Sequence, residues 1–346
     1  MSSVSYEDRV KQQIEQYANC DNIHDLPEAF HIWSHGFINP GLVEVFGVTT
    51  IPEFYAKAYL ETKKNTAFIS RLMNNTGRIL SIGCGDGGVE LDIVEYLLSK
   101  GESKFVMTCA DLSPILLDRL RKKADLKNLG KYIETIEVDL NLSLPDRRFD
   151  MIMANHSLHH IVELEKIFDY LKSHLRDRGI FATNDMIGRN GHMRWPETAA
   201  IIKAFWPMLS DSEKWHAQLK RLDDTFTDHD CSSDGFEGIR AQDVLPLILE
   251  RFHPYKFLGC GGFVDLIVDR GYGRAYDVSK SEDVEWIKFL SRLNDILLDA
   301  GCIRPTLMLA YFTKSAEEGW PEKFYRNRRA STAVRLKDPE WVKYYA

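Results

Sequence analysis

The sequence predicts an α/β fold built around a doubly wound parallel sheet. Over residues 78–186, short apolar runs alternate with segments whose apolar residues recur at helical spacing. The first of these runs leads directly into a stretch of glycines, as a strand does when it turns into a ligand-binding loop. Strands that alternate with helices pair in parallel and are covered by helices on both faces, so this segment is the predicted core.

The composition fits a large globular domain. The 346 residues are 44% hydrophobic and carry 44 basic against 51 acidic side chains, a formal net charge of −7. This balance disfavours broad binding to nucleic acid, which depends on many Lys and Arg side chains. No apolar run approaches the roughly 18–20 residues of a membrane span, no secretory signal opens the chain, and the six cysteines form no CxxC pair. We therefore expect a cytoplasmic protein with reduced cysteines and no membrane partner.

Each element follows from the apolar pattern. Helices are predicted before the core at 6–18 and 52–73, the second with Pro52 in its first turn. The expected strands of the core are 78–83, 104–111, 132–140, 149–155 and 179–185. Helices are expected between them at 89–101, 114–127 and 162–179. The sheet is completed by a strand at 255–263, a helix at 282–300 and a last strand at 304–314.

An aromatic-rich stretch at 188–250 interrupts this alternation, and we interpret it as an inserted helical cap. The elements resume after it, which indicates one elaborated domain rather than two modules. The predicted organisation is an N-terminal helical lid region (1–76), a core (77–187), the cap (188–250), the last strands and helix of the core (251–315) and a C-terminal tail (316–346). The aromatic-rich N-terminal region is compatible with a homodimer.

A glycine-rich loop follows the first predicted strand. Gly83, Cys84 and Gly85 lie between this strand and a helix, where glycines let the backbone approach a ligand and the helix start exposes N–H groups. The GxGxxG spacing alone is shared with dinucleotide-binding enzymes. Asp111 ends the second strand, where a carboxylate can accept hydrogen bonds from ribose hydroxyls. Asp139 ends the third strand, where it is placed to bind an adenine amino group.

With FDMIMANHSLHHI at the end of the fourth strand, the ordered motifs of residues 78–186 resemble class I S-adenosylmethionine-dependent methyltransferases. The resemblance implies a Rossmann-like sheet of seven strands with an antiparallel last strand. It implies S-adenosylmethionine as cofactor and S-adenosylhomocysteine as product. The cofactor-binding residues that it implies are Ser81, Gly83, Cys84, Gly85, Asp111, Leu112, Asp139, Leu140, Asn155 and Tyr59. Ser81 departs from the family pattern, which often has Asp or Glu at this position.

The residues after the fourth strand bear on which atom receives the methyl group. The (Asp/Asn)-Pro-Pro-(Tyr/Phe) tetrad that holds exocyclic amines in nucleic-acid base and protein glutamine methyltransferases is absent there. A hydroxyl must lose its proton as it attacks, and an unperturbed His titrates near neutral pH. His159, His160 and Asp185 form an arrangement that resembles sugar O-methyltransferases of natural-product biosynthesis. We expect one of these histidines, His160 before His159, to be the base that Asp185 orients. The alternative is that one of them only packs beside the cofactor, the role we expect for His156.

The loop after Asp185 supplies the predicted acceptor contacts, from Arg189, His192, Arg194 and Trp195. Arg can clamp an anionic group, and Trp offers a flat apolar wall to a sugar or ring. The alternative for each Arg is an ion pair with a nearby Asp. The acidic run at 223–230 is interpreted as a solvated loop, so no metal site is predicted.

The sequence therefore predicts an S-adenosylmethionine-dependent methyltransferase with a small-molecule acceptor, and favours O-methylation of a saccharide or secondary metabolite. The alternatives within methyl transfer are a small amine, RNA or protein as acceptor. A cofactor-binding scaffold without catalysis is the remaining alternative, because the glycine loop and the acids predict binding and not transfer. The cap and the N-terminal helices are expected to close the site and exclude water.

Overall fold

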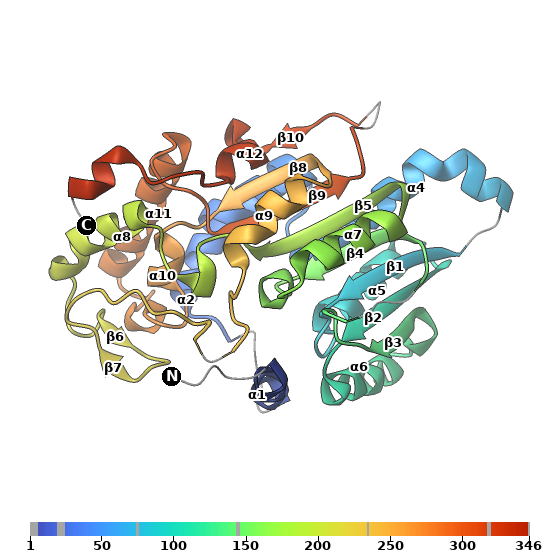
Figure 1. The fold of residues 1–346 in the computed structure, drawn as a ribbon, viewed down its shortest axis with the longest axis horizontal. Coiled ribbons are helices and arrows are strands. Elements are labelled where there is room, and N and C mark those ends of the chain that lie inside the picture. Colours follow the sequence, from blue (N-terminus) through green and yellow to red (C-terminus); the bar gives the residue numbers. More distant parts are fainter. Residues whose placement is uncertain are drawn as a thin grey trace.

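A central sheet runs through the molecule (Figure 1). A computed structural model describes residues 6–18, 25–73, 76–142, 146–233, 235–316 and 320–344. In these residues the sheet has eight strands in the order β10-β8-β9-β5-β4-β1-β2-β3. They are β1 (Gly77–Ile82), β2 (Phe105–Asp111), β3 (Ile133–Glu137), β4 (Phe149–Asn155), β5 (Leu175–Met186), β8 (His253–Cys260), β9 (Leu307–Thr313) and β10 (Lys323–Phe324).

The pairing confirms the parallel core. β3, β2, β1, β4 and β5 pair with one another in parallel, and β9 is antiparallel to both β5 and β8, as an antiparallel last strand requires. The expected count of seven strands is wrong by one, because β10 pairs with β8 and adds an edge strand. Its two residues are too short a run to give an alternating apolar pattern in the sequence.

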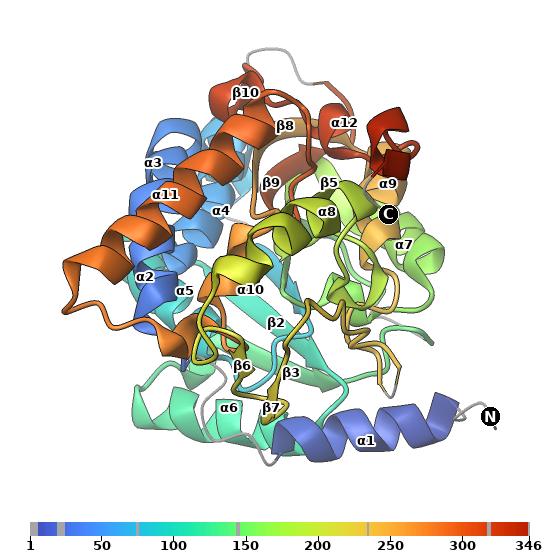
Figure 2. The ribbon, with the colours of Figure 1, turned by 90° about the vertical axis from the view of Figure 1, so that its left-hand side faces the viewer.

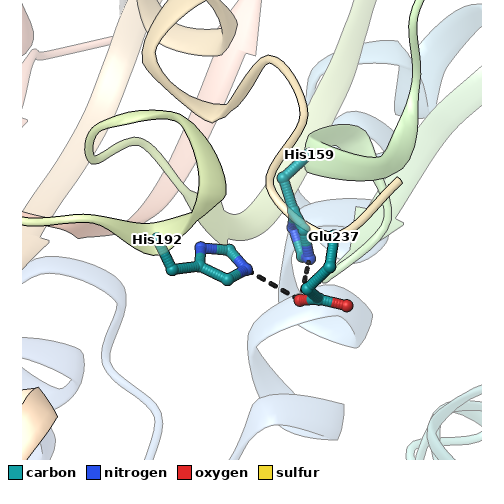
Figure 3. Close-up of side chains that lie close together, drawn as sticks. All are labelled: His159, His192 and Glu237. Carbon is teal, nitrogen blue, oxygen red and sulfur yellow. Dashed lines mark hydrogen bonds and ion pairs between the residues drawn. The ribbon is translucent and has the colours of Figure 1, made fainter. Parts of the chain in front are cut away.

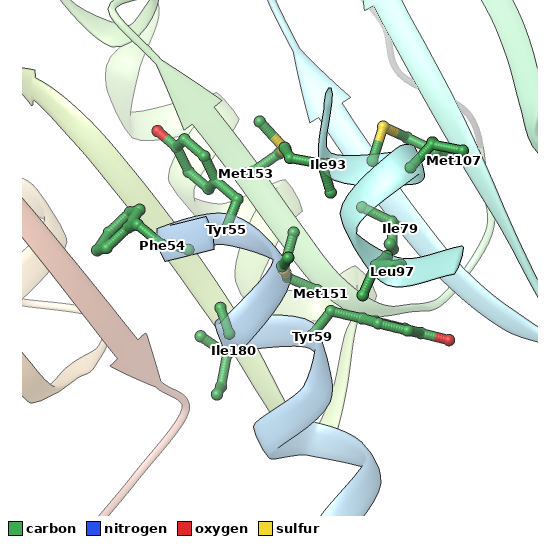
Figure 4. Packing of buried hydrophobic residues seen from close by; sticks show 14 of the residues in the cluster. Phe54, Tyr55, Tyr59, Ile79, Ile93, Leu97, Met107, Met151, Met153 and Ile180 are labelled. Carbon is green, nitrogen blue, oxygen red and sulfur yellow. The ribbon is translucent and has the colours of Figure 1, made fainter. Parts of the chain in front are cut away.

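β1, β2 and β4 are buried on both faces, which explains their near-continuous apolar runs, whereas the edge strand β3 has no buried residue. Ile79 and Met151 point to one face of the sheet, and Leu80 and Ile152 point to the other. The first face packs against α4 (Ile51–Met73), α5 (Gly88–Ser99) and α6 (Pro114–Leu126) (Figure 4). The second packs against α7 (Leu164–His174) and α9 (Ala241–Leu249). The parallel strands therefore share one carboxyl-terminal edge, the usual place for a ligand site.

The predicted cap is only partly helical. Residues 188–250 hold α8 (Pro196–Phe205), α9 and a hairpin of β6 (Trp215–His216) and β7 (Arg221–Leu222), joined by loops. Pro207 helps to end the helical pattern early, because proline lacks the N–H that a helix interior needs. α9 packs on α7 and β5, whereas Ile202 of α8 belongs to a third apolar cluster.

That third cluster joins the N-terminal region to the helices that follow β8. α8 packs there with α2 (Glu28–Trp33), α10 (Val264–Val268) and α11 (Ser281–Asp299) (Figure 2). α1 (Tyr6–Ala18), α4 and α11 confirm the helices expected at 6–18, 52–73 and 282–300. None of the described helices combines the length and the apolar character that a membrane crossing requires.

Candidate active site

The glycine loop between β1 and α5 turns through backbone conformations that glycine adopts most easily. Gly83, Gly85 and Gly87 have φ of +66°, +56° and +72°. A Cβ atom on Gly83 would lie 2.5 Å from Cβ of Ser157, and one on Gly87 would lie 2.1 Å from Cδ1 of Leu120. The loop therefore packs tightly against the end of β4 and against α6, and its backbone faces the space above the sheet.

The two predicted acids lie beside this loop. Asp111, at the end of β2, accepts hydrogen bonds from the backbone N–H of Gly85 at 2.7 Å and of Ser113 at 2.9 Å. Burial raises the pKa of its carboxyl, against these N–H donors. Asp139 lies two residues beyond β3 rather than in it, and accepts from the Tyr6 hydroxyl of α1 at 2.7 Å. Both carboxylates line the same cavity as the loop.

Ser81 is buried within β1 and does not line the cavity. Its hydroxyl donates to Oε1 of Glu90 at 2.7 Å, and Glu90 does line the cavity, from the first turn of α5. Burial raises the pKa of Glu90 to about 7. The carboxylate that position 81 lacks is thus present nine positions later. Sequence reasoning missed Glu90, although an acid at the buried start of an apolar helix was the available signal.

α4 reaches the site through Tyr55 and not through Tyr59. The Tyr59 side chain is fully buried and packs against Phe105, with its hydroxyl beside Gly77 at the amino end of β1. The expectation that Tyr59 contacts the cofactor is therefore wrong. The Tyr55 hydroxyl, one turn earlier, donates to Ala154 O at 2.8 Å and accepts from Asn184 N at 3.0 Å, so it holds β4 and β5 together near the rim.

Asn155 and His156 close the cavity at the end of β4. The Asn184 side-chain amide lies 3.2 Å from Oδ1 of Asn155 and 3.1 Å from Nε2 of His156. Burial lowers the pKa of His156 to about 4, so its ring is neutral at physiological pH. His156 also has a φ of +50°, which is uncommon for a residue with a side chain. The sequence predicted Asn155 here but not Asn184.

Asp185 pairs with His159 rather than with His160. His159 Nδ1 lies 2.5 Å from Oδ1 of Asp185, which is fully buried at the end of β5. Oδ2 of Asp185 accepts from the backbone N–H of Ser157 and Leu158 at 3.0 and 2.8 Å. This carboxylate therefore fixes both the loop that carries His159 and the orientation of its ring. The Asp185 contact expected for His160 is thus made by His159, because the register of this loop turns the first His of the pair toward β5.

Glu237, from the loop before α9, lies beside His159 and His192 (Figure 3). Its carboxylate also lies near His160. Its carboxylate lies 2.7 Å from His192 Nε2, 3.4 Å from His159 Nε2 and 3.7 Å from His160 Nε2. Sequence reasoning missed Glu237, since it lies 45 residues beyond His192 and belongs to no motif. It shows that part of residues 188–250 contributes directly to the site.

The charges around His159 set its protonation. Burial disfavours a charged ring, but Asp185 and Glu237 on its two sides outweigh burial and raise the pKa of His159 to about 10. The pKa of Asp185 is lowered, because the charge and hydrogen bond of His159 outweigh its burial. Hydrogen bonds and charges from His159 and His192 likewise outweigh burial and hold the pKa of Glu237 well below its usual range. Burial, together with the charge on His159, lowers the pKa of His160 to about 3.

Only part of the predicted acceptor loop faces the cavity. His192 and Arg194 line it, whereas Arg189 and Trp195 do not. The Arg194 guanidinium is buried, 3.0 Å from Asp265, and also donates to His192 O at 2.6 Å. Trp195 stacks under the guanidinium of Arg335 from the C-terminal tail. Arg189 and Trp195, which the sequence predicted as acceptor contacts, therefore lie outside the cavity lining.

Both Arg189 and Arg194 form ion pairs with nearby Asp side chains, the alternative given for each of them above. Arg189 lies 3.7 Å from Asp228, and Arg194 pairs with Asp265. The acidic run is not simply solvated either. Asp223 is buried and accepts from the Tyr272 hydroxyl at 2.6 Å, and Asp228 accepts from Arg194 N at 2.9 Å. These acids hold the insertion in place.

The cavity has a volume of about 2030 Å³. This exceeds the roughly 300–1,000 Å³ of typical small-molecule pockets, so it has room for a nucleoside cofactor and a second molecule. Its lining includes the glycine loop, Asp111 and Asp139, and also His159, His192 and Glu237. Two groups of residues with different chemistry thus open into one space.

Comparisons with known proteins agree with the predicted core. Residues 79–179 match a family described as "Methyltransferase domain". A probable methyltransferase, ltbC from Aspergillus luteorubrus, is 26% identical over 155 residues, which cover 40% of this chain and 53% of the relative. The chain thus matches about half the length of this curated relative.

Solved structures with a similar fold include two methyltransferases with bound S-adenosylhomocysteine. One is an O-methyltransferase from a trans-AT PKS multienzyme of Brevibacillus brevis, at 13% identity and a TM-score of 0.41, with 74% of this chain and 72% of that chain covered. The other is the N-methyltransferase NodS from Bradyrhizobium japonicum, at 11% identity and a TM-score of 0.38, with 89% and 100% covered.

Proposed function

We propose that this chain is an S-adenosylmethionine-dependent methyltransferase that methylates a hydroxyl of a small molecule, a saccharide or a secondary metabolite. The observation that carries the proposal is that the glycine loop and its acids open into the same cavity as His159, which Asp185 orients. The methyltransferase-domain match over residues 79–179 supports the choice of cofactor. S-adenosylhomocysteine is the corresponding product.

The glycine loop and the two acids beside it fit this cofactor. We assign Asp111 to accept from the two ribose hydroxyls and Asp139 to accept from the adenine amino group. The positive-φ turn at Gly83 and Gly85 lets the methionine part approach the backbone closely. Glu90 and Asn155 offer acceptors for its ammonium group from the cavity wall. When bound, the cofactor supplies a methyl group on a positively charged sulfur.

His159 is the residue we assign to the acceptor. Asp185 holds the Nδ1 side of the ring, so Nε2 points toward Glu237 and the cavity. A hydroxyl that takes the place of the Glu237 oxygen removes one of two carboxylates that stabilise the charged ring. Nε2 then releases its proton to water in the cavity, and its free lone pair accepts the hydroxyl proton as the oxygen attacks the methyl carbon. A positioned base of this kind accelerates such a step by roughly 10²–10⁴-fold.

A small amine is the second candidate acceptor, because the Glu237 carboxylate can hold an ammonium group beside His159. The two are separated by incubating the protein with methyl-labelled S-adenosylmethionine and matched pairs of alcohols and amines on one carbon skeleton. We expect labelled ethers, and loss of their formation in His159→Gln. Labelled amines whose formation survives in His159→Gln would replace the hydroxyl assignment.

A further inference from the structure

His159, His192 and Glu237 bring three side chains with metal-binding atoms to one point (Figure 3). The ligand atoms, one from each residue, all lie within 4.8 Å of one another. The residues come from three separate segments, the loop after β4, the turn after β5 and the loop before α9. All three line the cavity, so the point where they meet is open to ligands on one side.

The backbone fixes two of these segments against each other. Gly191 N donates to Gly238 O at 2.8 Å. Gly238 has a φ of +68°, and a Cβ atom there would lie 3.0 Å from His192 N, so only glycine fits. His192 itself has a φ of +56°. Non-glycine residues are held in this conformation at some cost, and such strain gathers at functional sites. His192 and Glu237 are therefore held side by side by the fold.

Asp185 completes the arrangement from the far side of His159. Metal-binding histidines usually give their other ring N–H to a carboxylate, which leaves the ligating nitrogen with a free lone pair. His159 has this relation to Asp185, with Nε2 directed at Glu237. The Asp185 and Glu237 carboxylates lie on the two sides of His159, and their two negative charges match the charge of a divalent ion bound at this point.

We propose that His159 Nε2, His192 Nε2 and Glu237 bind a divalent transition-metal ion, Zn²⁺ in preference to Mg²⁺. Two imidazoles and a carboxylate suit Zn²⁺, whereas Mg²⁺ prefers oxygen ligands throughout. Ligands about 2.0–2.2 Å from one ion lie roughly 3–3.5 Å apart. The His159–Glu237 pair already has this spacing at 3.4 Å, and the His192–Glu237 pair must open from 2.7 Å. Three protein ligands leave a position open to the cavity, as in catalytic zinc sites.

The ion changes how the acceptor is activated, an inference that rests on the proposed function. His159 is then a ligand, and the acceptor hydroxyl binds the ion at its open position. Coordination lowers the pKa of the bound hydroxyl, so its proton passes to water in the cavity. The oxygen then forms its bond to the methyl carbon as the bond from that carbon to sulfur breaks. Asp185 acts as a positioning residue for the ion through His159.

The test is metal binding by the whole chain after treatment with a chelator. Zn²⁺ affinity is measured by competition with a chelating dye, and Co²⁺ is titrated with its visible absorption as the signal. The variants are Glu237→Gln, His192→Asn and Asp185→Asn. The matched control is His229→Asn, since His229 is exposed and lines the cavity but lies outside the cluster. Calorimetric titration with S-adenosylhomocysteine reports whether each variant keeps its fold and cofactor site.

We expect one ion per chain for the wild type and for His229→Asn, with little affinity for Mg²⁺. Zn²⁺ affinity falls at least 100-fold in Glu237→Gln and His192→Asn, and roughly 10–100-fold in Asp185→Asn, as for other residues behind metal ligands. Wild-type protein that binds neither Zn²⁺ nor Co²⁺, or a Glu237→Gln variant that binds them equally well, overturns the metal site. Methyl transfer that persists in metal-free protein overturns the role of the ion in activating the acceptor and leaves the proposed function standing. Absence of S-adenosylhomocysteine binding to the wild type overturns the proposed function instead.

Discussion

Replacing Glu90 with Gln should make the folded protein more stable at neutral pH and change little at acidic pH. The Glu90 side chain is 3% exposed, and burial raises its pKa from 4.5 to about 7. Gln has nearly the same shape and can still accept from the Ser81 hydroxyl, which lies 2.7 Å from Oε1 of Glu90. The substitution therefore removes the ionisation and keeps the packing.

The size of the effect follows from proton linkage. Below pH 4.5 the carboxyl is protonated in both the folded and the unfolded chain, so Glu90 carries no penalty. Between pH 4.5 and about 7 only the unfolded chain ionises, so its contribution to the free energy of unfolding falls as the pH rises. A difference of about 2.5 pKa units corresponds to a loss of up to about 3 kcal/mol above pH 7.

Urea unfolding of the wild type and of Glu90→Gln at pH 5 and pH 8 measures this loss. The stability advantage of the variant should grow by about 2–3 kcal/mol between the two pH values. Glu95→Gln is the control, because Glu95 lies on the same helix, is exposed and pairs with Lys127 at the surface. Its effect should stay below about 1 kcal/mol at both pH values. If the stability advantage of Glu90→Gln does not change with pH, the pKa of Glu90 is not raised in the folded chain.

Four further substitutions test other parts of the site and the fold. With an acceptor in hand, Asp185→Asn should lower kcat by roughly 10²–10⁴-fold and leave S-adenosylhomocysteine affinity unchanged, measured by steady-state kinetics and calorimetry; equal kcat contradicts the role of Asp185. Gly83→Ala should weaken S-adenosylhomocysteine binding at least tenfold, since a Cβ there would lie 2.5 Å from Cβ of Ser157; unchanged affinity contradicts this. Tyr55→Phe should lower the free energy of unfolding by about 1–3 kcal/mol. Tyr59→Phe should leave S-adenosylhomocysteine affinity unaltered, and weaker binding by this variant would mean that Tyr59 does contact the cofactor.

The parts of the site that sequence reasoning found are those encoded locally. The glycine loop and Asp111 lie at the ends of strands that are buried on both faces and read as apolar runs, and Asp139 follows the edge strand β3. Because parallel strands end at one edge, residues just after them meet in space even when they are far apart in the chain. The same rule brought His159 and Asp185 together.

The parts that it missed depend on packing. Glu237 lies on an irregular loop, and its place over His159 is set by the contact of Gly238 with the turn that carries His192. Whether Tyr55 or Tyr59 faces the rim depends on where α4 crosses the sheet, since the two are one helical turn apart. His159 and His160 are adjacent, so only the short turn after β4 decides which ring meets Asp185.

The central claim is that the glycine loop, Asp111 and Asp139 form a site for S-adenosylmethionine. Calorimetric titration of S-adenosylhomocysteine into the wild type and into Asp111→Ala tests it most directly. We expect one binding site per chain in the wild type. The affinity of Asp111→Ala for S-adenosylhomocysteine should be at least tenfold weaker, because the ribose loses its carboxylate partner. Absence of binding to the wild type, or equal binding to both proteins, would contradict it.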